Sequence, residues 1–256
     1  MSFGGGAILP RIMRRRLTLA LAITTVAAPP TIALATPPVV WVQAGHVAPG
    51  EPGYSAQTGA SGGPFGNESA FTTRMRGALI TRLKAAGVDA RPLNSKIKPM
   101  GATGATFISL HHDQAGGSAA VGRAVTGGGE NYYHGEGTGM ASQTPYPDSG
   151  RHRTPATTVS PRVERTSTRL ATAIATALGR IRTSANGASA RFSGVVPRDS
   201  NPRMNHFYGY YRTNADARVL VELGAAGSDN VFLRKLPLIS TTLSKTIMAD
   251  LTTRGY

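Results

Sequence analysis

Residues 106–113 read Thr-Phe-Ile-Ser-Leu-His-His-Asp, and this stretch carries a strong signal of an α/β domain. It passes from a short apolar, β-branched run directly into three side chains that can hold a metal. Runs of this kind are typical of strands covered on both faces in α/β domains. Ligands and catalytic groups collect at the carboxyl ends of such strands. By themselves, His111 and His112 fit a metal site and a hydrogen-bonded strand end equally well.

Two further apolar runs carry side chains of the same kind. Residues 39–44 are apolar, and His46 follows the run after a single glycine. Residues 218–224 carry Glu222 in surroundings that are otherwise suited to burial. A carboxylate placed there must be paired, metal-bound or shifted in pKa, because an unpaired buried charge is costly.

Helical segments are expected between these strands. Asn67 has the chemistry of a helix N-cap, and apolar residues recur behind it at helical spacing until Gly87 ends the pattern. Glu68 therefore lies in the first turn, at the helix end that faces back toward the strand before it. Further helices are predicted from Ser160-Pro161 onward and over residues 237–251.

The segments between these elements are expected to be loops. Residues 92–105 read as a Gly- and Pro-rich connection, and a loop of small residues after position 113 leads to a strand over residues 130–133. The stretch 134–155 is longer than most loops. It is interpreted as either a functional cover or a disordered segment.

The amino terminus has the pattern of a secretory signal over residues 1–35. Four arginines precede an apolar run over residues 17–28, and Ala33-Leu34-Ala35 is a small-x-small cleavage site. Arg14-Arg15-Arg16-Leu17 also allows a twin-arginine route. No later segment approaches the roughly 20 apolar residues of a spanning helix. We expect an exported protein without a membrane span, with residues 36–256 forming one domain.

Composition narrows the chemistry and the partners. The chain has no cysteine, so a metal must be held by His, Asp or Glu. The formal charge of +15 becomes +11 without the four signal arginines, which favours anionic partners. No dense Lys/Arg run or interleaved aromatic pattern indicates nucleic acid. Anionic cell-envelope polymers fit the export signal better, and no feature indicates an oligomeric state.

His46, Glu68 and His111 form a set of two histidines and one carboxylate. Such a set holds catalytic zinc with one position open for water. The metal would lower the pKa of that water and polarise a carbonyl, and Glu222 would serve as general base and later as acid toward the leaving amine. This is a mechanism for amide hydrolysis.

Four segments, in this order, resemble the zinc-dependent N-acetylmuramoyl-L-alanine amidases of bacterial cell-wall turnover: Gln43-Ala44-Gly45-His46, Asn67-Glu68, residues 108–113 and residues 219–224. The resemblance spans approximately residues 39–251. It implies an α/β domain with a mixed, mostly parallel twisted sheet flanked by helices. It also implies cleavage of the bond between N-acetylmuramic acid and L-alanine in peptidoglycan.

Carried over position by position, the resemblance makes His46, Glu68 and His111 the zinc ligands and Glu222 the catalytic residue. One departure is Gln43, where the family usually has an aspartate that supports the first histidine. His112 is expected to face solvent or substrate. Asp113 either hydrogen-bonds a ligand histidine or caps a loop. A related zinc peptidase acting on other amides, or an inactive wall-binding module, stays open as an alternative function.

Overall fold

The computed structural model describes residues 1, 36–47, 49, 58–95, 101–126, 133–134, 154–155, 159–187, 192, 194–197 and 213–256. The signal prediction for residues 1–35 lies almost wholly outside them and stays a prediction, as do the domain bounds. The same holds for the proposed cover over residues 134–155, apart from its ends. There β5 (Tyr133–His134) pairs antiparallel with β6 (Thr154–Pro155).

A six-stranded mixed sheet forms the centre of the fold, in the order β2-β1-β3-β8-β4-β7. All neighbours are parallel except β4 and β8, which run antiparallel. The mixed, mostly parallel α/β sheet expected from the sequence is thus confirmed. Its strands are β1 (Val39–Ala44), β2 (Asp89–Leu93), β3 (Ala102–Asp113), β4 (Ala120–Arg123), β7 (Val195–Pro197) and β8 (Thr213–Ala225).

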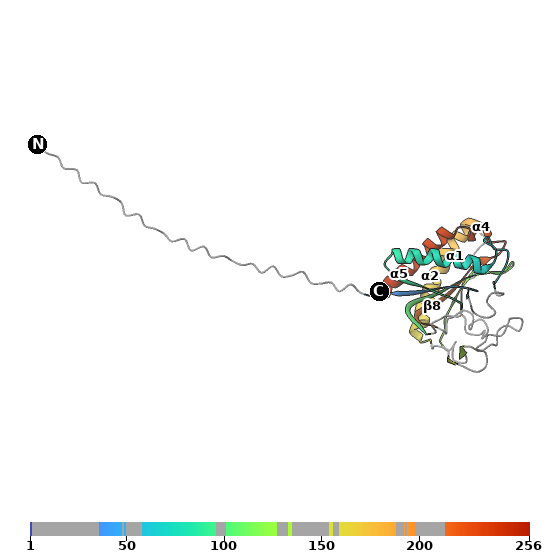
Figure 1. Cartoon of the computed structure of the whole chain (residues 1–256), viewed down its shortest axis with the longest axis horizontal. Helices are drawn as coiled ribbons and strands as arrows, with labels where there is room; N and C mark the ends of the chain where they lie inside the picture. The colour runs from blue at the N-terminus through green and yellow to red at the C-terminus, as the bar shows by residue number, and fades with distance from the viewer. Residues whose placement is uncertain are drawn as a thin grey trace. The chain divides into compact units, whose positions relative to one another are not determined.

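Three long helices, α1 (Glu68–Ala85), α2 (Pro161–Asn186) and α5 (Leu236–Thr253), pack against this sheet. α1 contacts β1, β2 and β3, α2 contacts β8 and β4, and α5 lies between the two helices. Figure 1 shows the three helices gathered along the sheet, with the short α4 (Asn230–Leu233) near them. No helix in the described part of the chain is long and apolar enough to cross a membrane.

Alternation along the strands decides which side chains enter the helix-facing core. On β3, Ile108 and Leu110 point into this core, while Phe107 belongs to a smaller cluster with Trp41. Burial of these apolar side chains supplies the main stabilisation of the fold. The helices contribute fully buried residues at helical spacing: Phe71, Met75 and Leu79 from α1, Leu170, Ile174 and Leu178 from α2, and Ile239, Leu243 and Ile247 from α5.

Two loop expectations are wrong. β3 begins at Ala102, inside the predicted Gly/Pro-rich connection, and β4 occupies residues that were expected to form a small-residue loop. In both places the chain pairs along β8. Pairing with a central strand therefore overrides the weak strand propensity of Ala, Thr and Gly.

Glu164 on α2 joins the helix layer to β4. Its carboxylate accepts hydrogen bonds from Nη1 of Arg123 at 2.9 Å and from the backbone N–H of Thr126 at 3.0 Å. Hydrogen bonds from Thr126 and then from Arg123 lower the pKa of Glu164 to about 2. The folded state therefore favours the ionised form.

We expect Glu164→Gln to destabilise the fold at pH 7, and the difference from wild type to shrink in acid. The folded pKa lies below the ordinary value of 4.5, so this stabilisation is complete above pH 4.5 and is lost as the pH falls toward 2. Urea unfolding of both proteins at pH 7, 4.5 and 3 measures the difference. A difference that does not change with pH would contradict this role.

Candidate metal centre

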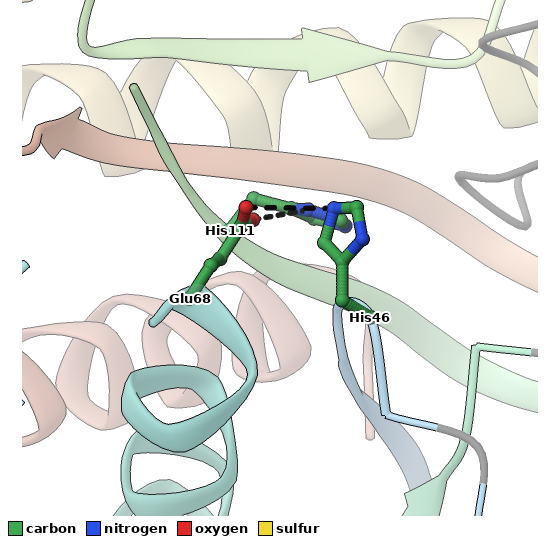
Figure 2. A group of neighbouring side chains, drawn as sticks. All are labelled: His46, Glu68 and His111. Atoms are coloured by element: carbon green, nitrogen blue, oxygen red, sulfur yellow. Dashed lines mark hydrogen bonds and ion pairs between the residues drawn. The ribbon is translucent and has the colours of Figure 1, made fainter. Parts of the chain in front are cut away.

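The three predicted ligands meet at the carboxyl edge of the sheet. His46 lies just beyond β1, Glu68 is the first residue of α1, and His111 is near the end of β3. Their side chains point toward one another (Figure 2). Each offers a ligand atom, and these atoms lie within 4.8 Å of one another. The structure thus brings together the three residues that sequence reasoning chose.

A helix N-cap and two hydrogen bonds to its carboxylate together position Glu68. Asn67 caps α1 by accepting a hydrogen bond from the N–H of Ala70 at 3.0 Å, so the helix begins at Glu68. The carboxylate then accepts the N–H of Ala60 at 3.0 Å and the N–H of His112 at 3.2 Å. Glu68 is therefore held from the loop before its helix and from the end of β3.

The separation between His46 and Glu68 fits a single small cation, and His111 and Glu68 lie at hydrogen-bond distance. Oε1 of Glu68 lies 2.8 Å from Nδ1 of His111, and Oε2 lies 3.4 Å from Nε2 of His46. Ligands about 2.0–2.2 Å from a tetrahedral zinc ion are roughly 3.4 Å apart. The rings of His46 and His111 meet edge to face, with centroids 5.4 Å apart. Two imidazoles and a carboxylate at these distances can hold zinc.

The charge states also suit a metal. Burial alone would raise the pKa of Glu68, but the hydrogen bond from His111 and the charges of both histidines lower it to about 2. Burial lowers the pKa of His46, against the opposing attraction of Glu68. Near neutral pH the site therefore presents an ionised carboxylate and a neutral imidazole, the forms that bind zinc.

His46 adopts a strained backbone. Its φ is 59°, and no other non-glycine residue in the described ranges has a positive φ. Such a conformation costs about 1–3 kcal/mol and persists only where the surroundings enforce it. The strain turns the chain sharply after β1, so that the imidazole faces Glu68.

Ser95 and Thr72 enforce this turn. Oγ of Ser95 accepts the N–H of Val47 at 2.8 Å and donates to the carbonyl of Ala44 at 3.1 Å, and the N–H of Ser95 donates to the carbonyl of Val47. Oγ1 of Thr72 donates to the carbonyl of Gly45 at 2.8 Å. The backbone on both sides of His46 is therefore clamped.

Gln43 does not provide this support. It is fully buried, its amide nitrogen donates to the carbonyl of Asn94 at 3.3 Å, and its amide oxygen accepts from the hydroxyl of Ser109. It therefore joins β1 to its neighbours. The backbone around His46 is supported instead by Ser95 and Thr72.

Two glycines form walls of the site. A β-carbon on Gly45 would lie 2.3 Å from Cε1 of His111, and one on Gly59 would lie 2.4 Å from Oε2 of Glu68. Gly59 also has a φ of 73°, which disfavours any other residue. Sequence reasoning missed Gly59 and Ser95, because neither carries a side chain able to bind a metal.

Glu222 lies on the strand next to His111. β3 and β8 are parallel, and Glu222 is the register partner of His111. Paired residues on adjacent strands share a face and are about 4.8 Å apart. Glu222 is half-buried, so its carboxylate stays within reach of solvent. The register shifts just after this pair, and such bulges are frequent next to functional sites.

His112 and Asp113, which follow His111 in the chain, make contacts away from the metal centre. His112 points to the opposite face, as the alternation predicts, but it is buried rather than solvent-facing, and its ring packs edge-on against Phe71 of α1. The carboxylate of Asp113 accepts the N–H groups of Gln114 and Ser118 at 2.8 and 3.2 Å. Asp113 was expected either to hydrogen-bond a ligand histidine or to cap a loop, and these hydrogen bonds cap the loop.

Gly45→Ala should weaken zinc binding by at least about tenfold, because the added methyl group displaces the ring of His111. Gly77→Ala is the matched control. Gly77 lies in α1 with open space around its β-carbon position, so this change should leave zinc binding alone and stabilise the helix slightly. Competition with a chromophoric chelator gives the affinities, and equal values for both variants would contradict the role of Gly45.

Ser95→Ala should weaken zinc binding by up to about thirtyfold, because two of its hydrogen bonds are each worth roughly 1 kcal/mol in positioning His46. Thr103→Ala removes one exposed hydroxyl that donates only locally to Gly101, and serves as control. The same chelator competition, with circular dichroism to verify folding, makes the measurement. Unchanged affinity in a folded Ser95→Ala protein would rule out the clamp.

Comparisons with known proteins bear on the fold. No protein-family model matches the sequence, and no curated protein matches it either. Among solved structures, the catalytic domain of CwlV, an N-acetylmuramoyl-L-alanine amidase from Bacillus (Paenibacillus) polymyxa var. colistinus, is 14% identical, with a TM-score of 0.47 over 84% of this chain and 98% of that one.

Two more solved structures are similar. Cwp6 from Clostridium difficile is 15% identical with a TM-score of 0.50, over 85% of this chain but 30% of that one. The N-acetylmuramoyl-L-alanine amidase AmiC2 of Nostoc punctiforme is 13% identical with a TM-score of 0.45, over 84% of this chain and 97% of that one. At 15% identity and a TM-score of 0.50, the likeness to Cwp6 concerns the fold alone.

Proposed function

We propose that this chain is an exported zinc-dependent amide hydrolase that cleaves the bond between N-acetylmuramic acid and L-alanine in peptidoglycan. One observation carries the proposal: His46, Glu68 and His111 converge within 4.8 Å, beside the register partner Glu222. The choice of substrate rests on the order of the sequence motifs. Such an activity would serve wall remodelling or cell separation in the periplasm or the cell wall.

The residues divide the chemical work. Zinc held by His46, Glu68 and His111 would supply a water of lowered pKa and polarise the scissile carbonyl. Glu68 keeps its negative charge because its hydrogen bonds hold it ionised. The clamp of Ser95 and Thr72 keeps His46 oriented before substrate arrives. Less conformational entropy is therefore lost in reaching the transition state.

Glu222 is the proposed proton carrier. It accepts a proton from the attacking water as the oxygen bonds to the carbonyl carbon. It then returns this proton to the nitrogen of L-alanine as the C–N bond breaks, which releases a free amine and a carboxylate. Its half-buried position on the same face as His111 suits both steps, because it reaches the site while remaining open to solvent.

The alternatives differ in testable ways. A related zinc peptidase would use the same residues on an amide within the stem peptide. An inactive wall-binding module would have no need for a half-buried carboxylate beside a metal site, so Glu222 favours an enzyme. The two enzyme readings predict different products from the same substrate.

Glu222→Gln should lower peptidoglycan hydrolysis by at least about a hundredfold, because the amide cannot accept the proton. Zinc content should stay at one ion per chain in both proteins, since Glu222 is not a ligand. Dye release from labelled peptidoglycan measures activity, elemental analysis measures zinc, and Glu164→Gln provides a carboxylate-to-amide control away from the site.

The same digests identify the bond that is cut. Mass spectrometry of wild-type products should show stem peptides that begin with a free L-alanine amine. Fragments cut within the stem peptide would favour the peptidase, and a zinc-loaded wild-type protein that releases nothing would rule out the proposed activity.

A further inference from the structure

A row of hollows follows one exposed side of α2. One hollow lies between α2 and α5, has a volume of about 510 Å³, and is lined by both helices. It shares Arg169 with the hollow at the start of α2, and Thr176 and Arg180 with the hollow at the end of α2. The surface that these three hollows line, here called the α2 groove, follows α2 from Pro161 to Ser184, which is roughly 35 Å at 1.5 Å per helical residue.

Positive side chains follow this groove at helical spacing. Arg165, Arg169 and Arg180 lie on one side of α2, and Lys245 comes from α5. All four are exposed. Arg165, Arg180 and Lys245 have no carboxylate partner among the residues that the structure describes. Three cations are therefore available to a ligand.

The acids along the groove are already engaged. Asp250 is buried and accepts from both Arg169 and Arg254, with its oxygens 2.8–3.0 Å from their nitrogens. Glu164 accepts from Arg123 and Thr126. Asp250 anchors Arg169 at the wall of the groove. It does not neutralise Arg165, Arg180 or Lys245, so the α2 groove attracts anions.

The floor of the groove indicates which kind of anion fits. Between α2 and α5 it consists of small side chains, Ala173, Ala177 and Ala249, with threonines beside them. The hydroxyls of Thr246 and Thr253 donate to backbone carbonyls four residues earlier, which leaves their methyl groups for contact. Phe192, beyond the end of α2, is the one aromatic ring among the described residues that line the three hollows, which is fewer than stacking of successive nucleic-acid bases requires.

We propose that the α2 groove binds a linear polyanion whose phosphates are joined by short polyol units, of the poly(glycerol phosphate) type. The repeated phosphate charge complements the exposed cations, and a chain without bulky side groups fits beside the small side chains of the floor. The groove lies in the helix layer, whereas His111 and Glu222 are on the sheet face that carries Phe107. Binding there would hold the protein to an anionic surface and leave the metal centre free.

Charge reversal in the groove tests this proposal. The double variant Arg180→Glu with Lys245→Glu should bind poly(glycerol phosphate) at least about tenfold more weakly at 150 mM salt. The slope of log affinity against log salt should fall by about 2, because two phosphate contacts are lost. The milder pair Arg180→Gln with Lys245→Gln should show a smaller loss in the same direction. Fluorescence anisotropy with a labelled polymer and the full chain gives both values.

A matched control separates the groove from net charge. Arg234→Glu with Lys235→Glu makes the same change in charge at exposed positions outside the groove, and should weaken binding less than about threefold. Equal losses in both double variants would overturn the proposal, since attraction would then follow net charge alone. Tighter binding of a single-stranded oligonucleotide at equal phosphate concentration would also overturn it. Neither result depends on the activity of the metal centre.

Discussion

The carboxylate of Glu68 is the contact on which the candidate site depends. Its two oxygens accept hydrogen bonds from the loop before α1, from the backbone of β3 and from the ring of His111, while it also faces His46. A buried carboxylate is tolerated only where donors replace the lost water, and here they hold its pKa near 2. The charge that attracts a cation therefore also joins the first helix to the sheet.

Much of this arrangement follows from local sequence. Residues 106–110 form a buried strand because they are apolar and β-branched, and His111 lies on the face shared with Phe107 and Ser109 because side chains alternate. Asn67 sets the start of α1, so Glu68 had to lie in the first turn. The convergence of His46, Glu68 and His111 could be predicted because the position of each depends on one element and its end.

The remaining features depend on contacts between distant segments. Gly59 and Ser95 act through the space they leave or the backbone they bind, and neither leaves a pattern in its neighbouring sequence. The burial of His112 against Phe71 is decided by how α1 packs on β3. The early start of β3 and the existence of β4 follow from pairing with β8, which is more than ninety positions further along the chain.

The position of β8 has a consequence for how the chain acquires its structure. This last strand of the sheet lies between β3 and β4, so the two halves of the sheet have no direct partner until residues 213–225 have been made. Contacts over such sequence separations form slowly, and unpaired strand edges can recruit other chains in the meantime. A chain released before this strand would lack both the sheet centre and Glu222. Joining the two halves of the sheet and adding Glu222 therefore depend on the same late strand, and α5 then completes the core.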